Sequence, residues 1–250
     1  MNPTTLRYAV DGGLATLTLD RPDSRNAVNR AMCDDIVAAA AAARENADVR
    51  LVLVRASGPV FCAGADLKER KGMSGDEIRA RRQAAFAAYE ALETLPMPAI
   101  AVVEGPAVGS GCEIAACCDF VIATPRASFA TPEALWGTIG ATQRLPRILG
   151  KQLAKDMMFT GRKLTAEEAR AAGFVTRIVE PSALEAALAE IAKIIVAAPQ
   201  AALRQAKSCI DQSVELDRRG ALALELAAME ENIARDTWRS GMAKFGSNKS

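Results

Sequence analysis

The chain has 250 residues, 50% of them hydrophobic and 24% charged, so it holds enough apolar material for one large globular domain and is not a disordered chain. Its 31 Lys and Arg residues balance 30 Asp and Glu residues, and a net charge of +1 gives no overall attraction to nucleic acid or to an acidic membrane surface. Histidine is absent, which excludes Ser-His-Asp triads, Cys-His pairs and zinc sites with histidine ligands. Acid–base chemistry must therefore use other groups, and carboxylates are the commonest choice after histidine.

Strand-like runs lie at 13–20, 50–56, 98–105, 119–124 and 173–180, and Ala-rich helical stretches lie between them. The first two helices are predicted at 29–46 and 74–95, and the second begins with a capping-box pattern, Ser74 with Glu77. This alternation predicts an α/β fold with parallel strands.

Strand signals stop after about residue 181, and three amphipathic helices follow, with Pro199 as a break between two of them. Such a helical region can contact other subunits or pack on its own domain, and the pattern alone favours neither.

The segment 60–70, VFCAGADLKER, follows the strand at 50–56 and places small residues where a helix begins. Small side chains let a ligand approach backbone N–H groups, and Asp66 can cap the helix. The segment is therefore either an anion-binding turn or only a capped turn.

A second loop, 105–111, carries Gly105, Gly109, Ser110 and Gly111 and also leads into a helix. Its G-S-G lacks the third glycine of a dinucleotide-binding loop, so that reading is rejected. The two loops could instead supply one N–H each to a single oxyanion.

Two carboxylates follow the second loop. Glu113 lies in an apolar helix, where burial without a partner would be costly and would raise its pKa. Glu133 follows a Thr-Pro helix start, 20 residues further on (133 − 113), with the strand at 119–124 between them. Both acids could project into one cleft.

Together these segments resemble the enoyl-CoA hydratase/isomerase, or crotonase, family. RPDSRNAVNRAM resembles its CoA loop, FCAGADLKE its first oxyanion segment, GPAVGSGCEIAACCDFVIAT its central signature, and FATPEALWGTIGATQRLPRILGK the segment with its second acid. The resemblance implies a spiral of ββα repeats over residues 1–195 and a helical region at 196–250 that makes trimers or dimers of trimers.

The resemblance also implies roles for individual residues. The amides of Ala63 and Ser110 would hold a thioester oxygen, and Glu113 and Glu133 would be catalytic. Isomerases of the family typically keep only the acid matching Glu133, so we predict a hydratase that adds water across the 2,3 double bond of a 2-enoyl-CoA. Double-bond isomerisation, other CoA-enolate chemistry and weakly catalytic CoA-ester binding stay open as alternatives.

The substrate is expected to be an acyl-CoA thioester, with no separate cofactor and no metal. The residues implied to bind CoA or the acyl group are Arg25, Ala27, Ala63, Gly64, Ala65, Asp66, Leu67, Lys68, Gly109 and Trp136, and Phe86 could also line the pocket. The loop GTIGATQRLPR is about three residues shorter than the family pattern, which leaves the shape of the acyl pocket open.

The sequence further predicts a cytoplasmic protein that binds neither nucleic acid nor membranes. No run approaches the roughly 18 apolar residues of a membrane span, and the N-terminus lacks a signal-peptide pattern. No C-x-x-C pair occurs, which favours buried thiols for the six cysteines, Cys33, Cys62, Cys112, Cys117, Cys118 and Cys209.

Overall fold

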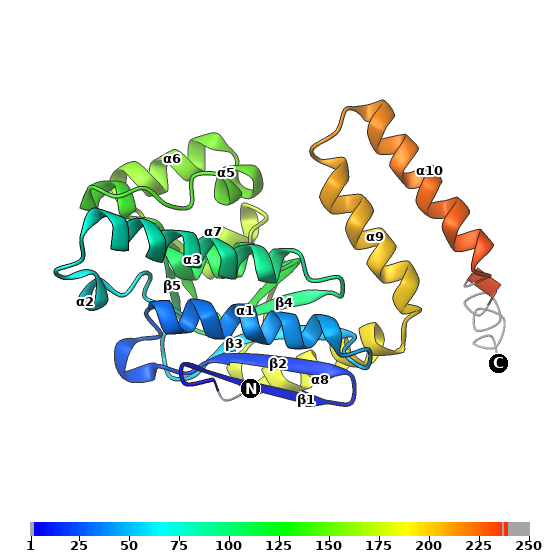
Figure 1. The fold of residues 1–250 in the computed structure, drawn as a ribbon, viewed down its shortest axis with the longest axis horizontal. Helices are drawn as coiled ribbons and strands as arrows, with labels where there is room; N and C mark the ends of the chain where they lie inside the picture. Colours follow the sequence, from blue (N-terminus) through cyan, green and yellow to red (C-terminus); the bar gives the residue numbers. More distant parts are fainter. Residues whose placement is uncertain (1–2, 237, 240–250) are drawn as a thin grey trace.

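The computed structural model describes residues 3–236 and 238–239, and its central feature is a six-stranded sheet in the order β1-β2-β3-β4-β6-β9 (Figure 1). A second sheet has the order β5-β7-β8. The strands are β1 (Leu6–Asp11), β2 (Leu14–Leu19), β3 (Leu51–Ala56), β4 (Ala99–Val103), β5 (Pro106–Val108), β6 (Phe120–Ala123), β7 (Ser128–Ala130), β8 (Leu164–Thr165) and β9 (Arg177–Ile178).

Ten α-helices and three 3₁₀ turns are present within the described residues. The helices are α1 (Arg30–Glu45), α2 (Leu67–Arg70), α3 (Gly75–Glu93), α4 (Ser110–Ala116), α5 (Arg144–Leu149), α6 (Lys151–Thr160), α7 (Ala166–Ala171), α8 (Leu184–Ala197), α9 (Gln200–Ser213) and α10 (Arg218–Ala234), and the turns are η1 (Pro22–Ser24), η2 (Glu133–Trp136) and η3 (Pro181–Ala183).

The predicted α/β class is confirmed, but the large sheet is not wholly parallel. Strands β2, β3, β4, β6 and β9 pair in parallel, whereas β1 pairs antiparallel with β2. Gly12 and Gly13 join these two strands, both with positive φ, as a tight hairpin turn requires. The sequence did not predict β1, because most of its side chains are at least partly exposed and its apolar pattern is weak.

Both faces of the large sheet are buried, which explains the continuous apolar runs of its inner strands. Val52 and Val54 of β3 join the main core with α1 and α3, whereas Leu51 and Leu53 point to the other face. On that other face α8 packs through Leu184, Leu188 and Ile191.

Two helices begin within one residue of their predicted starts, and the second does so with its predicted capping box. The Asn29 side chain accepts a hydrogen bond from the Met32 amide and caps α1, and Ser74 with Glu77 forms a complete capping box on α3. These caps fix where the two helices begin.

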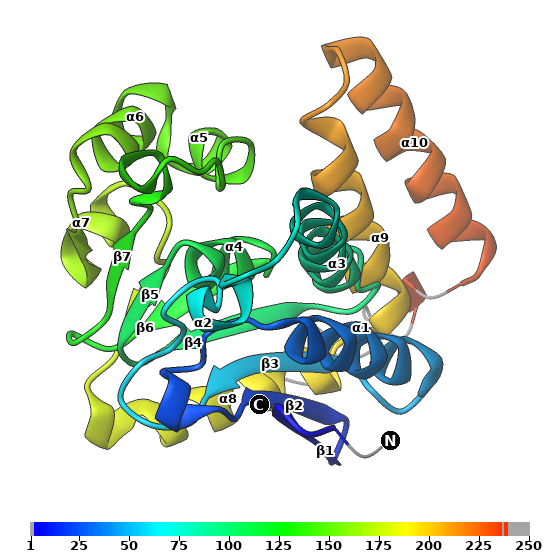
Figure 2. The ribbon, with the colours of Figure 1, turned by 60° about the vertical axis from the view of Figure 1, so that its left-hand side comes forward.

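The C-terminal helices α9 and α10 form an antiparallel pair that stands away from the rest of the chain (Figures 1 and 2). The chain turns by 102° between the segment Pro181–Ala197 and α9, and Pro199 occupies the position before α9, as predicted. The expected boundary between 195 and 196 falls inside the last turn of α8, and residues 240–250 lie outside the described part of the chain.

Within the described residues no single helix is long and apolar enough to cross a membrane, although the bent pair Pro181–Ala197 and Gln200–Ser213 passes on length and composition together.

Candidate active site

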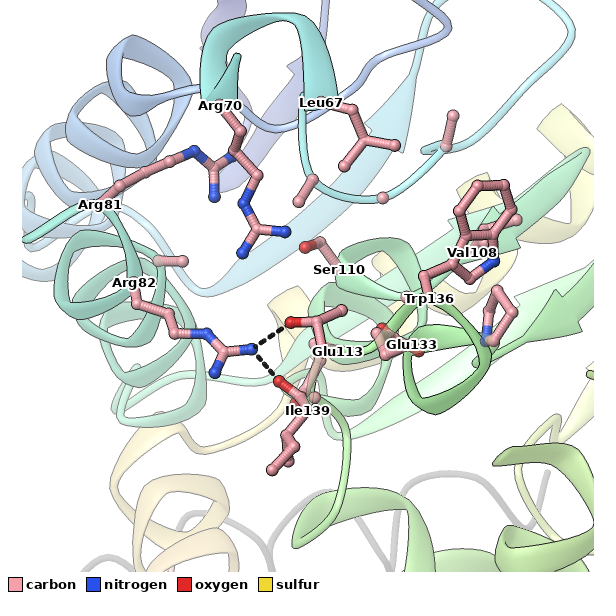
Figure 3. A pocket seen from close by; sticks show the side chains of 18 of the residues that line it. Leu67, Arg70, Arg81, Arg82, Val108, Ser110, Glu113, Glu133, Trp136 and Ile139 are labelled. Atoms are coloured by element: carbon pink, nitrogen blue, oxygen red, sulfur yellow. Dashed lines mark hydrogen bonds between the residues drawn. The ribbon is translucent and has the colours of Figure 1, made fainter. Parts of the chain in front are cut away.

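A pocket of about 330 Å³ lies between α2, α3, α4 and the segment that follows η2 (Figure 3). It brings together the two loops and the two acids that the sequence singled out. Among its lining residues are Ala63, Gly64, Ala65, Leu67, Gly109, Ser110, Glu113, Glu133 and Trp136, as well as Phe86.

The first loop supplies a free amide, but at Ala65 and not at Ala63. The Ala63 amide donates to the Arg25 carbonyl oxygen at 3.0 Å, so the prediction that it holds a thioester oxygen is wrong. Val28 pairs with Ala65 as a parallel bridge: the Val28 amide donates to Gly64, and the Asp66 amide donates to Val28. Because neighbouring amides in an extended chain point in opposite directions, the Ala65 N–H faces away from Val28, and no acceptor among the described residues takes it.

The second loop supplies the amide of Ser110. Ser110 is the first residue of α4, and the first amides of a helix have no acceptor within it. Gly109 before it has φ of 51°, and a Cβ added there would lie 2.5 Å from Oε1 of Glu133. Glycine is therefore required at this position both by the backbone conformation and by the approach of the acid.

Glu113 is buried on α4, and it has the partners that such a carboxylate needs. Its Oε1 accepts from the Ala141 amide at 2.6 Å, and its Oε2 accepts from Nη1 of Arg144 at 3.1 Å. Arg144 is itself buried and also binds Glu93 of α3 through Nε and Nη2. These hydrogen bonds offset the free-energy cost of burying the Glu113 carboxylate.

Glu133 is in the opposite situation. It begins η2, its Oε2 is buried, and no described residue donates a hydrogen bond to that atom. Burial raises the pKa of the Glu133 carboxyl, and the negative charge of Glu113 raises it further. A Cβ at Gly109 or at Gly140 would come too close to the Glu133 carboxyl group. The absence of a side chain at these two glycines therefore leaves room for it.

The raised pKa of Glu133 has a consequence for stability. A folded-state value above the unfolded one means that the folded protein binds more protons, so stability is lost as pH rises from the ordinary value of 4.5 through the raised one. We therefore expect Glu133→Gln to gain stability relative to the wild type as pH is raised.

Urea unfolding of both proteins at pH 4.5 and pH 8 measures this effect. The exposed Glu90→Gln on α3 is the matched control, since it should change little with pH. A difference between Glu133→Gln and wild type that is the same at both pH values would contradict the assignment.

Other predicted ligand residues lie outside the pocket lining. Arg25 and Lys68 are exposed, Ala27 is half-buried, and their contact with CoA stays a prediction. Asp66 is committed within the protein: its side chain caps α2 and binds Arg21, and its amide donates to Val28.

The sequence analysis missed the pocket's arginines. Arg70 of α2 and Arg81 and Arg82 of α3 all line it, and so do Tyr89 and Ile139. Arg82 donates through Nη2 to Oγ1 of Thr138 at 3.0 Å and to the Ile139 carbonyl oxygen, which fastens the short loop to α3 (Figure 3). The run RARRQ at 79–83 carried this signal, but helical spacing alone does not say which arginine turns inward.

The fold and the pocket define an α/β protein whose cavity combines free backbone amides with two carboxylic acids. The model of the enoyl-CoA hydratase/isomerase family matches residues 9–249, and the chain belongs to that family. The predicted crotonase fold is thereby confirmed: the chain superposes on the crystal structure of an enoyl-CoA hydratase from Bacillus anthracis with a TM-score of 0.93 at 32% identity, covering 97% of this chain and 96% of that one.

Two relatives show the range of activities among similar proteins. An enoyl-CoA isomerase/hydratase of Mycosarcoma maydis is 36% identical over 245 residues, covering 93% of this chain and 89% of its own. A crotonyl-CoA hydratase of Syntrophomonas wolfei is 34% identical over 236 residues, covering 93% and 91%.

Proposed function

We propose that this protein is an enoyl-CoA hydratase, which adds water to a 2-enoyl-CoA to give a 3-hydroxyacyl-CoA. The observation that carries the proposal is the contrast between the two acids in one pocket. Glu113 has a cationic partner in Arg144, whereas Glu133 is half-buried with an unpaired oxygen and a raised pKa. Two carboxyl groups whose environments differ in this way can act as base and acid in one reaction.

The two free amides would activate the substrate. A thioester oxygen between the N–H groups of Ala65 and Ser110 would accept two hydrogen bonds that strengthen as negative charge develops on it. Each such donor typically lowers a barrier by about 2.7 to 4 kcal/mol. The same polarisation makes C3 electrophilic and prepares C2 to accept a proton.

The acids would then carry out the addition. Glu113 takes a proton from water, the water oxygen bonds to C3, and protonated Glu133 delivers its proton to C2. Both oxygens of Glu113 already accept one hydrogen bond, but each carboxylate oxygen can accept a second, so water can still bind there. The addition consumes one water and leaves the proton on Glu113 and the negative charge on Glu133, so a proton must pass from Glu113 to Glu133 before the next turnover.

Isomerisation of an enoyl-CoA is the second candidate. It is favoured by the same contacts of Glu113, because an acid that only anchors the short loop and Arg144 would leave Glu133 to move the proton alone. The isomerase would then depend on Glu133 and not on Glu113.

A hydration assay separates the candidates. We expect loss of the ultraviolet absorbance of the conjugated thioester when the protein is mixed with crotonyl-CoA or with another member of a panel of short, branched, aromatic and carboxylated 2-enoyl-CoAs. If no member is hydrated, the proposal is wrong. Consumption of a 3-enoyl-CoA that survives Glu113→Gln would establish the isomerase, and CoA-ester binding without turnover would establish a binding protein.

We also propose that α9 and α10 contact other subunits, as the resemblance implied. The two helices and the turn between them expose apolar side chains that a monomer has no reason to present to water, and several of these line the groove between the helices. These residues are Ile210, Val214, Leu216, Leu222, Leu226, Met229 and Ile233.

A further inference from the structure

The pocket carries a positive charge that the proposed reaction does not use. Three arginines line it, Arg70, Arg81 and Arg82, but only Arg81 has a carboxylate partner, Glu69. Arg81 also donates to the Val28 carbonyl oxygen, so its guanidinium is committed within the protein.

Arg70 is the unusual member of this group. Its guanidinium extends from the end of α2 into the pocket (Figure 3), and no residue in the described part of the chain accepts a hydrogen bond from it. Its Nε is buried and unpartnered. Burial lowers the pKa of Arg70, and repulsion from Arg81 and Arg82 lowers it further. Arg70 is partly buried, and its buried Nε has no acceptor among the described residues, so a bound anion would supply the missing partner.

Arg82 adds to the same wall. Its Nη2 donates to Thr138 and Ile139, but it forms no ion pair with any described residue, and its guanidinium lines the cavity. Figure 3 shows both guanidinium groups on the side of the pocket away from Trp136.

We propose that the substrate's acyl group ends in a carboxylate, and that Arg70, with Arg82 beside it, binds this carboxylate inside the pocket. The proposal rests on the proposed function, since it names the acyl group of the same CoA thioester. Arginine suits a carboxylate because its planar N–H pairs match the two oxygens. A cavity of about 330 Å³ is at the small end of ligand pockets, which fits a short acyl chain.

The phosphates of CoA are a poorer match for these arginines. The pantetheine arm separates them from the thioester, whereas Arg70 and Arg82 line the same small cavity as Ser110 and Glu133. Arg25 and Lys68, which lie outside this lining and are exposed, are the cations predicted to meet them.

Calorimetric binding of two unreactive saturated thioesters tests the proposal without requiring turnover. We expect the wild type to bind glutaryl-CoA, which ends in a carboxylate, at least about 10-fold more tightly than butyryl-CoA. Arg70→Gln should abolish this preference and leave butyryl-CoA binding within about 2-fold, which also shows that the variant is folded. Arg79→Gln removes a charge from an exposed site on α3 and should keep the preference.

Two binding results would overturn the proposal: equal binding of both thioesters by the wild type, or an equal loss for both in Arg70→Gln, which would mean that Arg70 binds CoA. A hydratase that turns over only uncharged enoyl-CoAs would leave the proposed function standing and reject this inference. Selective binding of glutaryl-CoA without hydration of any thioester would support this inference and reject the proposed function.

Discussion

Replacing Glu133 by glutamine is expected to lower kcat for hydration by about 10²- to 10⁴-fold, the usual contribution of a positioned acid. Glutamine keeps the size of the side chain but cannot give up the proton that C2 needs. Because the substitution keeps the size and shape of this lining side chain, KM should change far less than kcat. Steady-state rates on the best 2-enoyl-CoA of the panel measure both constants.

Glu113→Gln is the companion variant for this measurement. In a hydratase it should lower kcat by a similar factor, since both acids act in one step. Wild-type-like kcat in Glu133→Gln would show that Glu133 does not take part in hydration, and a loss confined to that variant would show the same of Glu113.

Replacing Arg144 by leucine is expected to destabilise the protein by about 3 to 5 kcal/mol, because the change leaves Glu113 charged, buried and without its cation. The same change frees Glu93, so α3 loses its ionic link to α4 and α5. Urea unfolding followed by circular dichroism gives the free energy difference.

Arg147→Leu, on the same helix, is the control. Its ion pair with Glu215 is exposed and should contribute at most about 1 kcal/mol. The double variant Glu113→Gln and Arg144→Leu should recover part of the loss, because the unpaired charge is then absent. Equal destabilisation by the two leucine variants would show that the buried pair contributes nothing special.

Local signals in the sequence predicted the inner strands and the helix starts well. Strands β3 and β4 are apolar on both faces because the sheet is covered on both faces there, whereas β2 alternates between buried and half-buried residues. The Ser74–Glu77 box marks α3 through its own hydrogen bonds. The short strands β5, β7 and β8 were not predicted, because two or three residues are too few to show the alternation of apolar and polar residues that marks a strand.

The site was predicted only in part, because some of its features depend on residues that are distant in the sequence. The two acids and the two loops stand out as chemical groups in an apolar context, but the direction of a single amide depends on pairing with a distant strand. The loop residue chosen first, Ala63, turned out to face Arg25, and only the bridge from Val28 to Ala65 shows which N–H is free. The partner of Glu113 lies 31 residues further along, at Arg144, and no local pattern links the two.

The main-chain link between the 25–28 loop and the Ala63–Asp66 segment has a consequence for how binding energy is used. Three hydrogen bonds join the two segments, so they form one unit in which neither can shift alone. If the nucleotide end of CoA binds Arg25 and Ala27 as predicted, it would also restrict the motion of the Ala63–Asp66 segment, which supplies an amide to the thioester oxygen. Binding free energy from the nucleotide would then lower the barrier to addition at the double bond. Thioesters that lack the nucleotide should therefore have a lower kcat, even at saturating concentration.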